Sequence, residues 1–78
     1  MAKKKKSVKR DAKEAARFRL ALAHARLSQM GASRVLKMGD RTIRAYALGE
    51  RVAHLTVYYS LAYIAANPHL AGDDLLSD

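Results

Sequence analysis

Apolar residues recur along this chain at helical rather than strand spacing. Between residues 12 and 25 the alanines, Phe18 and Leu22 repeat with a period near 3.6. Asp11 stands directly before this stretch and suits a helix N-cap. We expect a first helix from about residue 12, with Phe18, the sole phenylalanine, as its core anchor. No segment shows the strict alternation of a strand, so the fold class predicted is all-α with four to five helices.

Two short helices are expected next. Ser28 is a good N-cap for a helix that runs to about Lys37, and the pair Met38 and Gly39 makes the following turn. A third helix begins at Gly39 or Asp40 and ends near residue 48, where Gly49 fits a left-handed C-cap.

The last helix is predicted over 55–66 and ends before Pro68. Its apolar residues cover it nearly all round, and such a helix must be buried on every side. A domain this small cannot readily do so within one chain, so we expect a homodimer interface here. The interface residues expected are Leu55, Tyr58, Tyr59, Leu61, Ala62, Ile64 and Ala65. The alternative is a monomer whose C-terminal tail covers the second face.

Charge divides the chain into three parts. Residues 1–10 should form a flexible basic arm, 11–68 the folded domain and 69–78 an acidic tail. The net charge is +8, and all fifteen basic side chains lie at or before Arg51. A basic front and a neutral back are expected when one end of a domain faces phosphate and the other packs against protein.

Several classes of function find no support in the residues. The chain has no cysteine, and its three histidines lack ligand-like spacing, so no disulfide, metal or cofactor is expected. No nucleophile–base set, carboxylate pair or glycine-rich phosphate loop is recognisable, so we expect no enzyme and no small-molecule ligand. The apolar part of the uncharged run 52–72 falls short of the ~20 residues that a bilayer needs. The basic N-terminus lacks the apolar region of a signal peptide, and a cytoplasmic location is predicted.

The segment 27–50 carries the most specific signal. Two helices crossing at a tight turn need a small residue where they touch, which Ser33 supplies, and apolar residues to lock them. The locking residues expected are Leu36, Met38, Ile43 and Tyr46. With Ile43 and Tyr46 inward, the outward residues of the second helix are Asp40, Arg41, Arg44 and Ala45. An outward arginine can donate two hydrogen bonds to guanine in the DNA major groove. Asp40 either accepts from cytosine or, as we favour, caps the helix.

A pattern of residues runs through this segment: LSQ at Leu27, the small residue and leucine that follow, the turn, then Thr42–Ile43 and Gly49. This pattern resembles that of the lambda-repressor-like (XRE) helix-turn-helix family. The resemblance implies a DNA-binding domain in which Gln29 clamps a phosphate and the outward residues of 40–48 face bases. Lys37 replaces the usual turn glycine, and Ser33 the usual alanine. More weakly, GDRTIRAY followed by LTVYYSLAYIAANP is similar to small anti-CRISPR-associated autorepressors of phages and mobile elements. That likeness implies a homodimer that represses its own operon.

The expected partner is therefore double-stranded DNA, and the expected function is a dimeric repressor on a palindromic promoter site, bacterial or phage-encoded and nucleoid-associated. The residues expected at the DNA backbone are Gln29, Ser28, Thr42, Arg34, Lys37, Arg51, Lys3, Lys4, Lys5 and Lys6. Two alternatives stay open. One is an antitoxin-like or adaptor module that binds another protein, and the other is a sequence-neutral nucleoid or RNA-binding protein driven by its lysines.

Overall fold

The structure, a computed structural model, describes residues 10–76 and is all-α, as predicted. Its elements are α1 (Ala12–Ala25), α2 (Gln29–Leu36), α3 (Asp40–Leu48) and α4 (Leu55–Ala66), followed by the 3₁₀ turns η2 (Pro68–Leu70) and η3 (Gly72–Asp74). The basic arm expected at 1–10 lies outside the described residues except for Arg10. No helix within 10–76 is long and apolar enough to cross a membrane.

The helix ends follow from residues that the sequence singled out. The Asp11 side chain accepts a hydrogen bond from the Glu14 amide, and Ser28 Oγ accepts one from the Gly31 amide at 2.9 Å. Both side chains thereby satisfy amides that a helix leaves unpaired at its start. Gly49 ends α3 with φ +80°, the predicted left-handed cap. Pro68 opens η2 just beyond the end of α4.

Phe18 is the centre of the core, as expected. It is fully buried, and its ring makes edge contacts with Tyr46 of α3 at 5.4 Å and with Tyr58 of α4 at 6.3 Å. Ile43 and Leu61 are the other large side chains that are completely enclosed. One ring from α1 thus joins the helix that precedes the loop 49–54 to the helix that follows it.

A second contact between α1 and α4 is polar. The Arg17 guanidinium lies 4.1 Å from the centre of the Tyr58 ring, and the Tyr58 hydroxyl donates to Glu14 Oε1 at 3.4 Å. Burial, and then the negative charge of Glu14, raise the pKa of Tyr58 above its usual value of 10.0, while Arg17 opposes them. The hydroxyl is therefore held in its neutral form.

The helix α4 is apolar, as predicted. The prediction that it is buried on every side is wrong. Val57, Leu61 and Ile64 are buried within the domain itself, and Tyr58 and Ala65 are half-buried. Leu61 and Ile64 therefore offer little surface for a dimer contact, because the helix already packs them against its own core. The apolar residues that stay exposed form one stripe, named here the α4 stripe, made of Leu55, Tyr59, Ala62, Tyr63 and Ala66, and Thr56 and Ser60 are exposed beside it. The residues of the stripe lie within about 100° of one another around the helix.

The C-terminal tail folds back from α4 toward α2 and the loop that precedes α2. Leu75 forms an isolated antiparallel bridge with Leu27, and the Leu76 amide donates to the Arg26 carbonyl at 2.8 Å. Ala71 is buried, whereas Leu70 and Leu76 remain exposed. The tail thus covers α2 and the loop before it, and it leaves the α4 stripe open.

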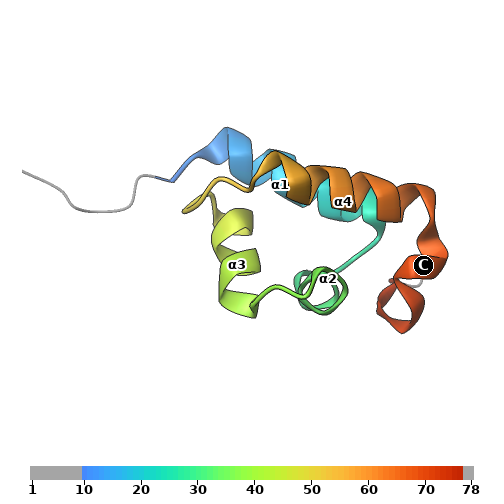
Figure 1. Cartoon of the computed structure of the whole chain (residues 1–78). Helices are drawn as coiled ribbons and strands as arrows, with labels where there is room; N and C mark the ends of the chain where they lie inside the picture. Colours follow the sequence, from blue (N-terminus) through green and yellow to red (C-terminus); the bar gives the residue numbers. More distant parts are fainter. Residues whose placement is uncertain (1–9, 77–78) are drawn as a thin grey trace, which may run out of the picture.

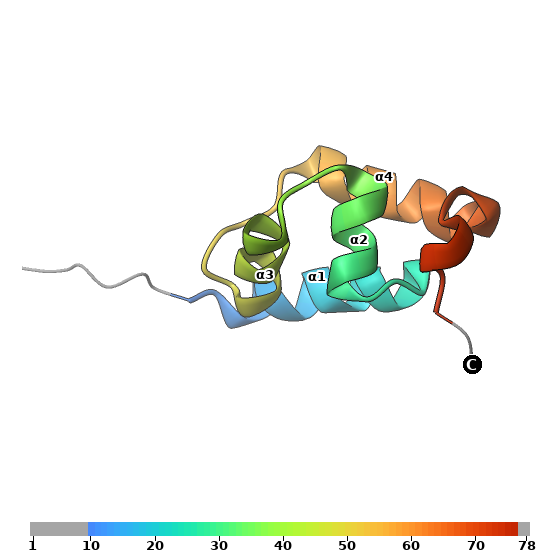
Figure 2. The same ribbon diagram turned by 90° about the horizontal axis from the view of Figure 1, so that it is seen from below.

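The helices are arranged as two pairs. α1 and α4 lie side by side, and α2 and α3 lie below them together with the η3 turn (Figure 1). Seen from below, α2, α3 and the tail all stand in front of the α1–α4 pair (Figure 2). This lower side is where the sequence predicts contact with DNA.

Candidate nucleic-acid interface

The turn between α2 and α3 is held by a buried serine. Ser33 is 8% exposed, and its Oγ donates a hydrogen bond of 2.5 Å to the Met38 carbonyl. The small side chain predicted at the helix contact therefore also fixes the turn. Lys37 ends α2 in the left-handed region, at φ +60°. That conformation favours glycine, so a lysine here is held by the surrounding turn at an energetic cost.

The far end of α3 is fixed by two contacts with α1 and its cap. Arg19 of α1 donates to the Ala47 carbonyl at 2.6 Å, which satisfies a carbonyl at the end of α3. The Asp11 amide donates to the Gly49 carbonyl at 2.8 Å. A Cβ on Gly49 would lie 2.5 Å from the Asp11 carbonyl oxygen, so the close approach itself requires glycine. The position of α3 is thus set at both ends by particular residues.

Between those ends, α3 presents two unpaired cations. Ile43 and Tyr46 point inward as predicted, and Arg41 and Arg44 are exposed. Neither arginine forms an ion pair or a side-chain hydrogen bond with another residue of 10–76. Arg44 and Asp40 line a hollow together with Gln29, the residue expected to hold a phosphate. The structure therefore brings the predicted base-facing and phosphate-facing side chains together on the lower side.

Two predictions about α3 need correction. Ala45 was expected to face outward, but it is 8% exposed. The left-handed turn at Gly49 folds the chain back, so that the Glu50 amide donates to the Ala45 carbonyl and the following residues shield this methyl group. Asp40 was expected to cap the helix, but Gly39 is the N-cap and no side chain bonds the first amides. Asp40 lies in the first turn, where its charge still favours the positive end of the helix.

The residues expected at the DNA backbone divide by exposure. Gln29, Lys37 and Arg51 are exposed, whereas Thr42 and Ser28 are half-buried. Ser28 Oγ is already used as the N-cap of α2. Arg34 is exposed but paired with Asp74. The lysines predicted to contact DNA at positions 3–6 lie outside the described residues.

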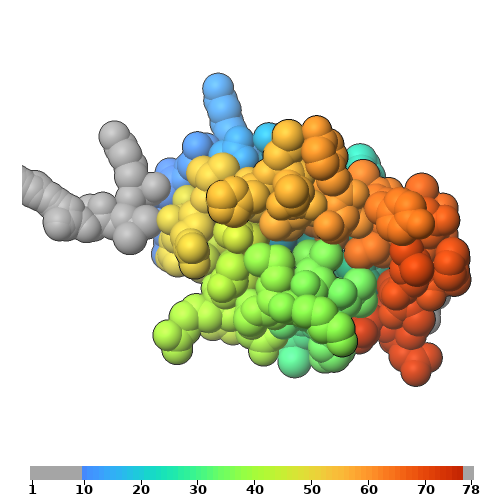
Figure 3. Space-filling view, viewed as in Figure 1, coloured from blue at the N-terminus to red at the C-terminus, as the bar shows by residue number. Residues whose placement is uncertain are grey.

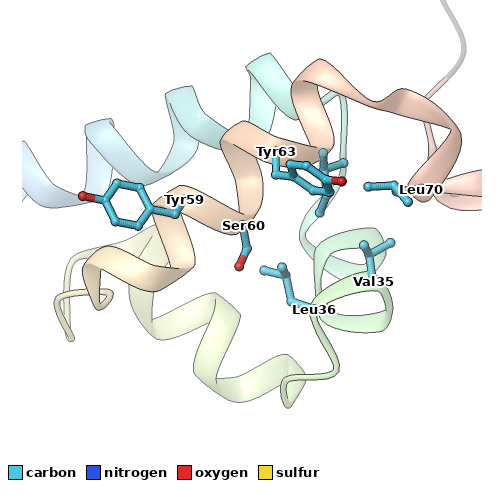
Figure 4. Close-up of a pocket in the computed structure, with 7 residues that line it drawn as sticks. Val35, Leu36, Tyr59, Ser60, Tyr63 and Leu70 are labelled. Carbon is cyan, nitrogen blue, oxygen red and sulfur yellow. The ribbon is translucent and has the colours of Figure 1, made fainter.

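The α4 stripe borders an open groove. The groove has a volume of about 690 Å³ and lies between α2, the C-terminal half of α4 and Leu70 (Figure 4). Its lining is Val35, Leu36, Tyr59, Ser60, Tyr63, Ile64 and Leu70. Tyr59 and Tyr63 belong to both the stripe and the groove, and each is more than 60% exposed. In the space-filling view, α4 covers the upper front of the molecule and the tail lies beside α2 below it (Figure 3).

The sequence did not reveal the roles of three residues that position α2, α3 and the C-terminal tail. Arg19 gives no signal in the sequence, because its partner is a backbone carbonyl of a distant helix. Asp74 was read only as part of an acidic tail, yet it pairs with Arg34. In the sequence, Gly31 signals only a residue that weakens a helix. The structure shows that a Cβ there would lie 3.1 Å from the Asp74 carbonyl oxygen, so the glycine makes room for the tail.

Comparison with known proteins adds no relative: no family model, curated protein or solved structure matches the chain. Within 10–76 the structure groups no set of three or more acidic or histidine side chains that could hold a metal. The surface built from α2 and α3 is therefore interpreted from its own chemistry.

Proposed function

We propose that this protein is a sequence-specific regulator that binds double-stranded DNA through α3 as a homodimer, and that it acts as a repressor by occupying a promoter. The observation that carries the proposal is a pair of exposed arginines, without a side-chain partner among residues 10–76, on a helix fixed at both ends. A guanidinium held in this way can read guanine O6 and N7 in the major groove. Gln29, beside Arg44, supplies a phosphate contact that sets the orientation of the helix.

The resemblance to lambda-repressor-like helix-turn-helix proteins supports the same function, as does the weaker likeness to anti-CRISPR-associated autorepressors. Both rest on the residues 27–50 and on the apolar helix that follows. By this resemblance the protein acts in the cytoplasm of a bacterium, whether encoded by its host or by a phage.

The α4 stripe supports a two-fold dimer of a particular geometry. Ser60 and Ile64, which face α2 across the groove, lie roughly a third of a turn around α4 from the middle of the stripe. A two-fold axis that is perpendicular to α4 and points toward the α2–α3 side then pairs two stripes in antiparallel orientation. The same axis places both α3 helices on one side of the dimer, as binding to one duplex requires.

The spacing of this arrangement agrees with the DNA repeat. α4 has 12 residues and is about 18 Å long, and α3 lies near its N-terminal end (Figure 1). Antiparallel pairing puts the two N-terminal ends at opposite ends of the dimer. The two α3 helices are then separated by more than the length of α4, toward the ~34 Å of one DNA turn.

The groove beside the stripe completes this interface. In the antiparallel arrangement, the N-terminal end of one α4 lies opposite the C-terminal half of the other, where the groove opens. The partner copy brings there the exposed apolar residues Val52 and Leu55, which are 59% and 53% exposed. Neither the groove lining nor α4 carries a formal charge, which suits a second copy of the same surface.

The DNA proposal is tested by selection from a random-sequence duplex pool, followed by fluorescence anisotropy on the selected and a scrambled duplex. The expected result is a preference of roughly 10³ or more that persists at ~150 mM salt, with two protein chains per duplex. Equal affinity for both duplexes, with a steep loss in salt, would contradict it and favour the sequence-neutral alternative. Absence of binding, with a stable complex with another protein, would favour the adaptor alternative.

The dimer geometry is tested by single cysteines, since the chain has none of its own. Ala62→Cys lies near the expected two-fold axis and should cross-link to itself under mild oxidation. Leu55→Cys should not, because antiparallel pairing about an axis near Ala62 separates the two copies by roughly 20 Å along the helices. Ala16→Cys, exposed on α1 away from the stripe and the groove, is the control for random collision. Efficient cross-linking of Leu55→Cys would indicate a parallel pair and contradict the proposal.

A further inference from the structure

The acidic tail places one carboxylate against a cation of α2. Asp74 Oδ1 lies 2.6 Å from Arg34 Nε, a short distance typical of a charge-assisted hydrogen bond. The Arg34 side chain nevertheless remains 59% exposed, and that of Asp74 22%. The pair therefore lies at the surface, and a second anion has access to the guanidinium from solvent.

The backbone around Asp74 holds the carboxylate in this place. The Leu76 amide donates to the Arg26 carbonyl, and Leu75 bridges to Leu27. Gly31, one turn before Arg34, lacks the Cβ that would press on the Asp74 carbonyl oxygen at 3.1 Å. Contacts on the tail and a glycine on α2 thus fit the two segments to each other. The ion pair is the polar part of a docked segment and not an isolated surface contact.

The pair also lies on the side where DNA is proposed to bind. α2, α3 and the tail face the same way when the molecule is viewed from below (Figure 2). Gln29 and Arg34 belong to the same short helix, and Gln29 shares a hollow with Arg44. In the proposed complex, a duplex held by α3 and Gln29 has its phosphate backbone running along α2.

We propose that Asp74 occupies the position of a DNA phosphate on Arg34, so that the tail and the duplex compete for this arginine. The inference rests on the proposed DNA-binding function. Carboxylate and phosphate oxygens accept the same charge-assisted hydrogen bonds from a guanidinium. Because phosphate contacts carry no sequence information, the tail lowers affinity for any duplex and leaves base preference unchanged.

The test is a double-mutant cycle of Asp74→Asn and Arg34→Gln, measured by anisotropy on the selected and the scrambled duplex. Asp74→Asn should raise affinity about 3- to 10-fold for both duplexes at low salt, and it should steepen the salt dependence by about 0.9 in log–log slope, as for one added phosphate contact. Arg34→Gln should lower affinity clearly in the Asp74→Asn background and little in the unaltered protein. Asp73→Asn is the matched control, since it removes the same charge from an exposed residue of the same turn.

Equal losses from Arg34→Gln in both backgrounds would overturn the proposal, as would equal gains from Asp74→Asn and Asp73→Asn. A second measurement uses the unaltered protein and does not depend on the folding of a variant: the Arg34 Nε–H resonance should shift when saturating duplex is added. An unchanged resonance in a protein that binds DNA contradicts this inference alone. Failure of every variant to bind duplex contradicts the proposed function as well.

Discussion

α3 and α4 both bury an apolar face, but α3 exposes a charged face and α4 an uncharged one. Both helices pack inward through large apolar side chains, Ile43 and Tyr46 in one and Leu61 and Ile64 in the other. Outward, α3 presents two exposed arginines that have no ion-pair partner within 10–76, whereas α4 presents the uncharged α4 stripe. The inward faces show how the domain folds, and only the outward faces indicate what it binds. Charge on α3 favours phosphate and bases, and the uncharged stripe favours a second apolar surface.

The largest effect is expected on the α4 side, from Tyr59→Glu. It places a charge in the middle of the proposed interface and should weaken dimerisation by about 2–4 kcal/mol, the range for the loss of a central aromatic contact. Sedimentation equilibrium measures the dimer dissociation constant. Ala16→Glu adds the same charge to an exposed residue of α1, away from the stripe and the groove, and should leave dimerisation intact. A dimer that tolerates Tyr59→Glu would remove α4 from the interface.

The next effect belongs to α3. Arg44→Ala should reduce affinity for the selected duplex by roughly 1–3 kcal/mol and relax base preference at one position, because a bidentate contact to guanine is lost. Arg41→Ala should act in the same way at another position. Lys13→Ala, an exposed residue of α1, is the control for the loss of one positive charge. Unchanged affinity and preference in both arginine variants would exclude α3 as the reading helix.

The two glycines that flank α3 allow a matched comparison of its ends. Gly49→Ser should destabilise the domain by at least about 1–2 kcal/mol, because φ is +80° and a Cβ meets the Asp11 backbone. Gly39→Ser should be neutral or stabilise by a few tenths of a kcal/mol. It has an ordinary φ of −65°, nothing within 4 Å, and a serine would cap the helix. Urea unfolding measures both, and a tolerated Gly49→Ser would contradict the described contact with Asp11.

The smallest effect concerns the contact of α4 with α1. Since the pKa of Tyr58 is raised in the folded state, the unfolded chain loses this proton first as the pH rises. The associated stability is fully present below pH ~10 and declines as the pH rises toward the folded-state pKa. Unfolding free energies at pH 8.5 and 10.5 should differ less in Tyr58→Phe than in the unaltered protein. Tyr63→Phe, at an exposed tyrosine, should keep the original difference.

The sequence was sufficient for features that depend on local chemistry. Asp11, Ser28 and Gly49 act at helix ends because capping depends on one side chain and the nearest amides. Ile43 and Tyr46 are inward because helical spacing fixes their direction. Helix positions, the core anchor and the exposed arginines could therefore be predicted.

Features that depend on distant contacts could not be predicted. Ala45 is shielded because the chain doubles back at Gly49, and Leu61 and Ile64 are buried because α1 lies against α4. The pairing of Arg34 with Asp74 spans 40 residues and has no pattern in the sequence. The apolar content of α4 led to the prediction of an interface, but only the packing showed which residues of the helix remain exposed.

The most direct test of a paired α3 surface is hydroxyl-radical footprinting of the protein on its selected duplex. Two α3 helices related by a two-fold axis predict two protected segments, symmetric about a centre and about 10 base pairs apart on one face of the DNA. Arg44→Ala should weaken both segments together. A single protected segment, or protection spread evenly along the duplex, would contradict the account.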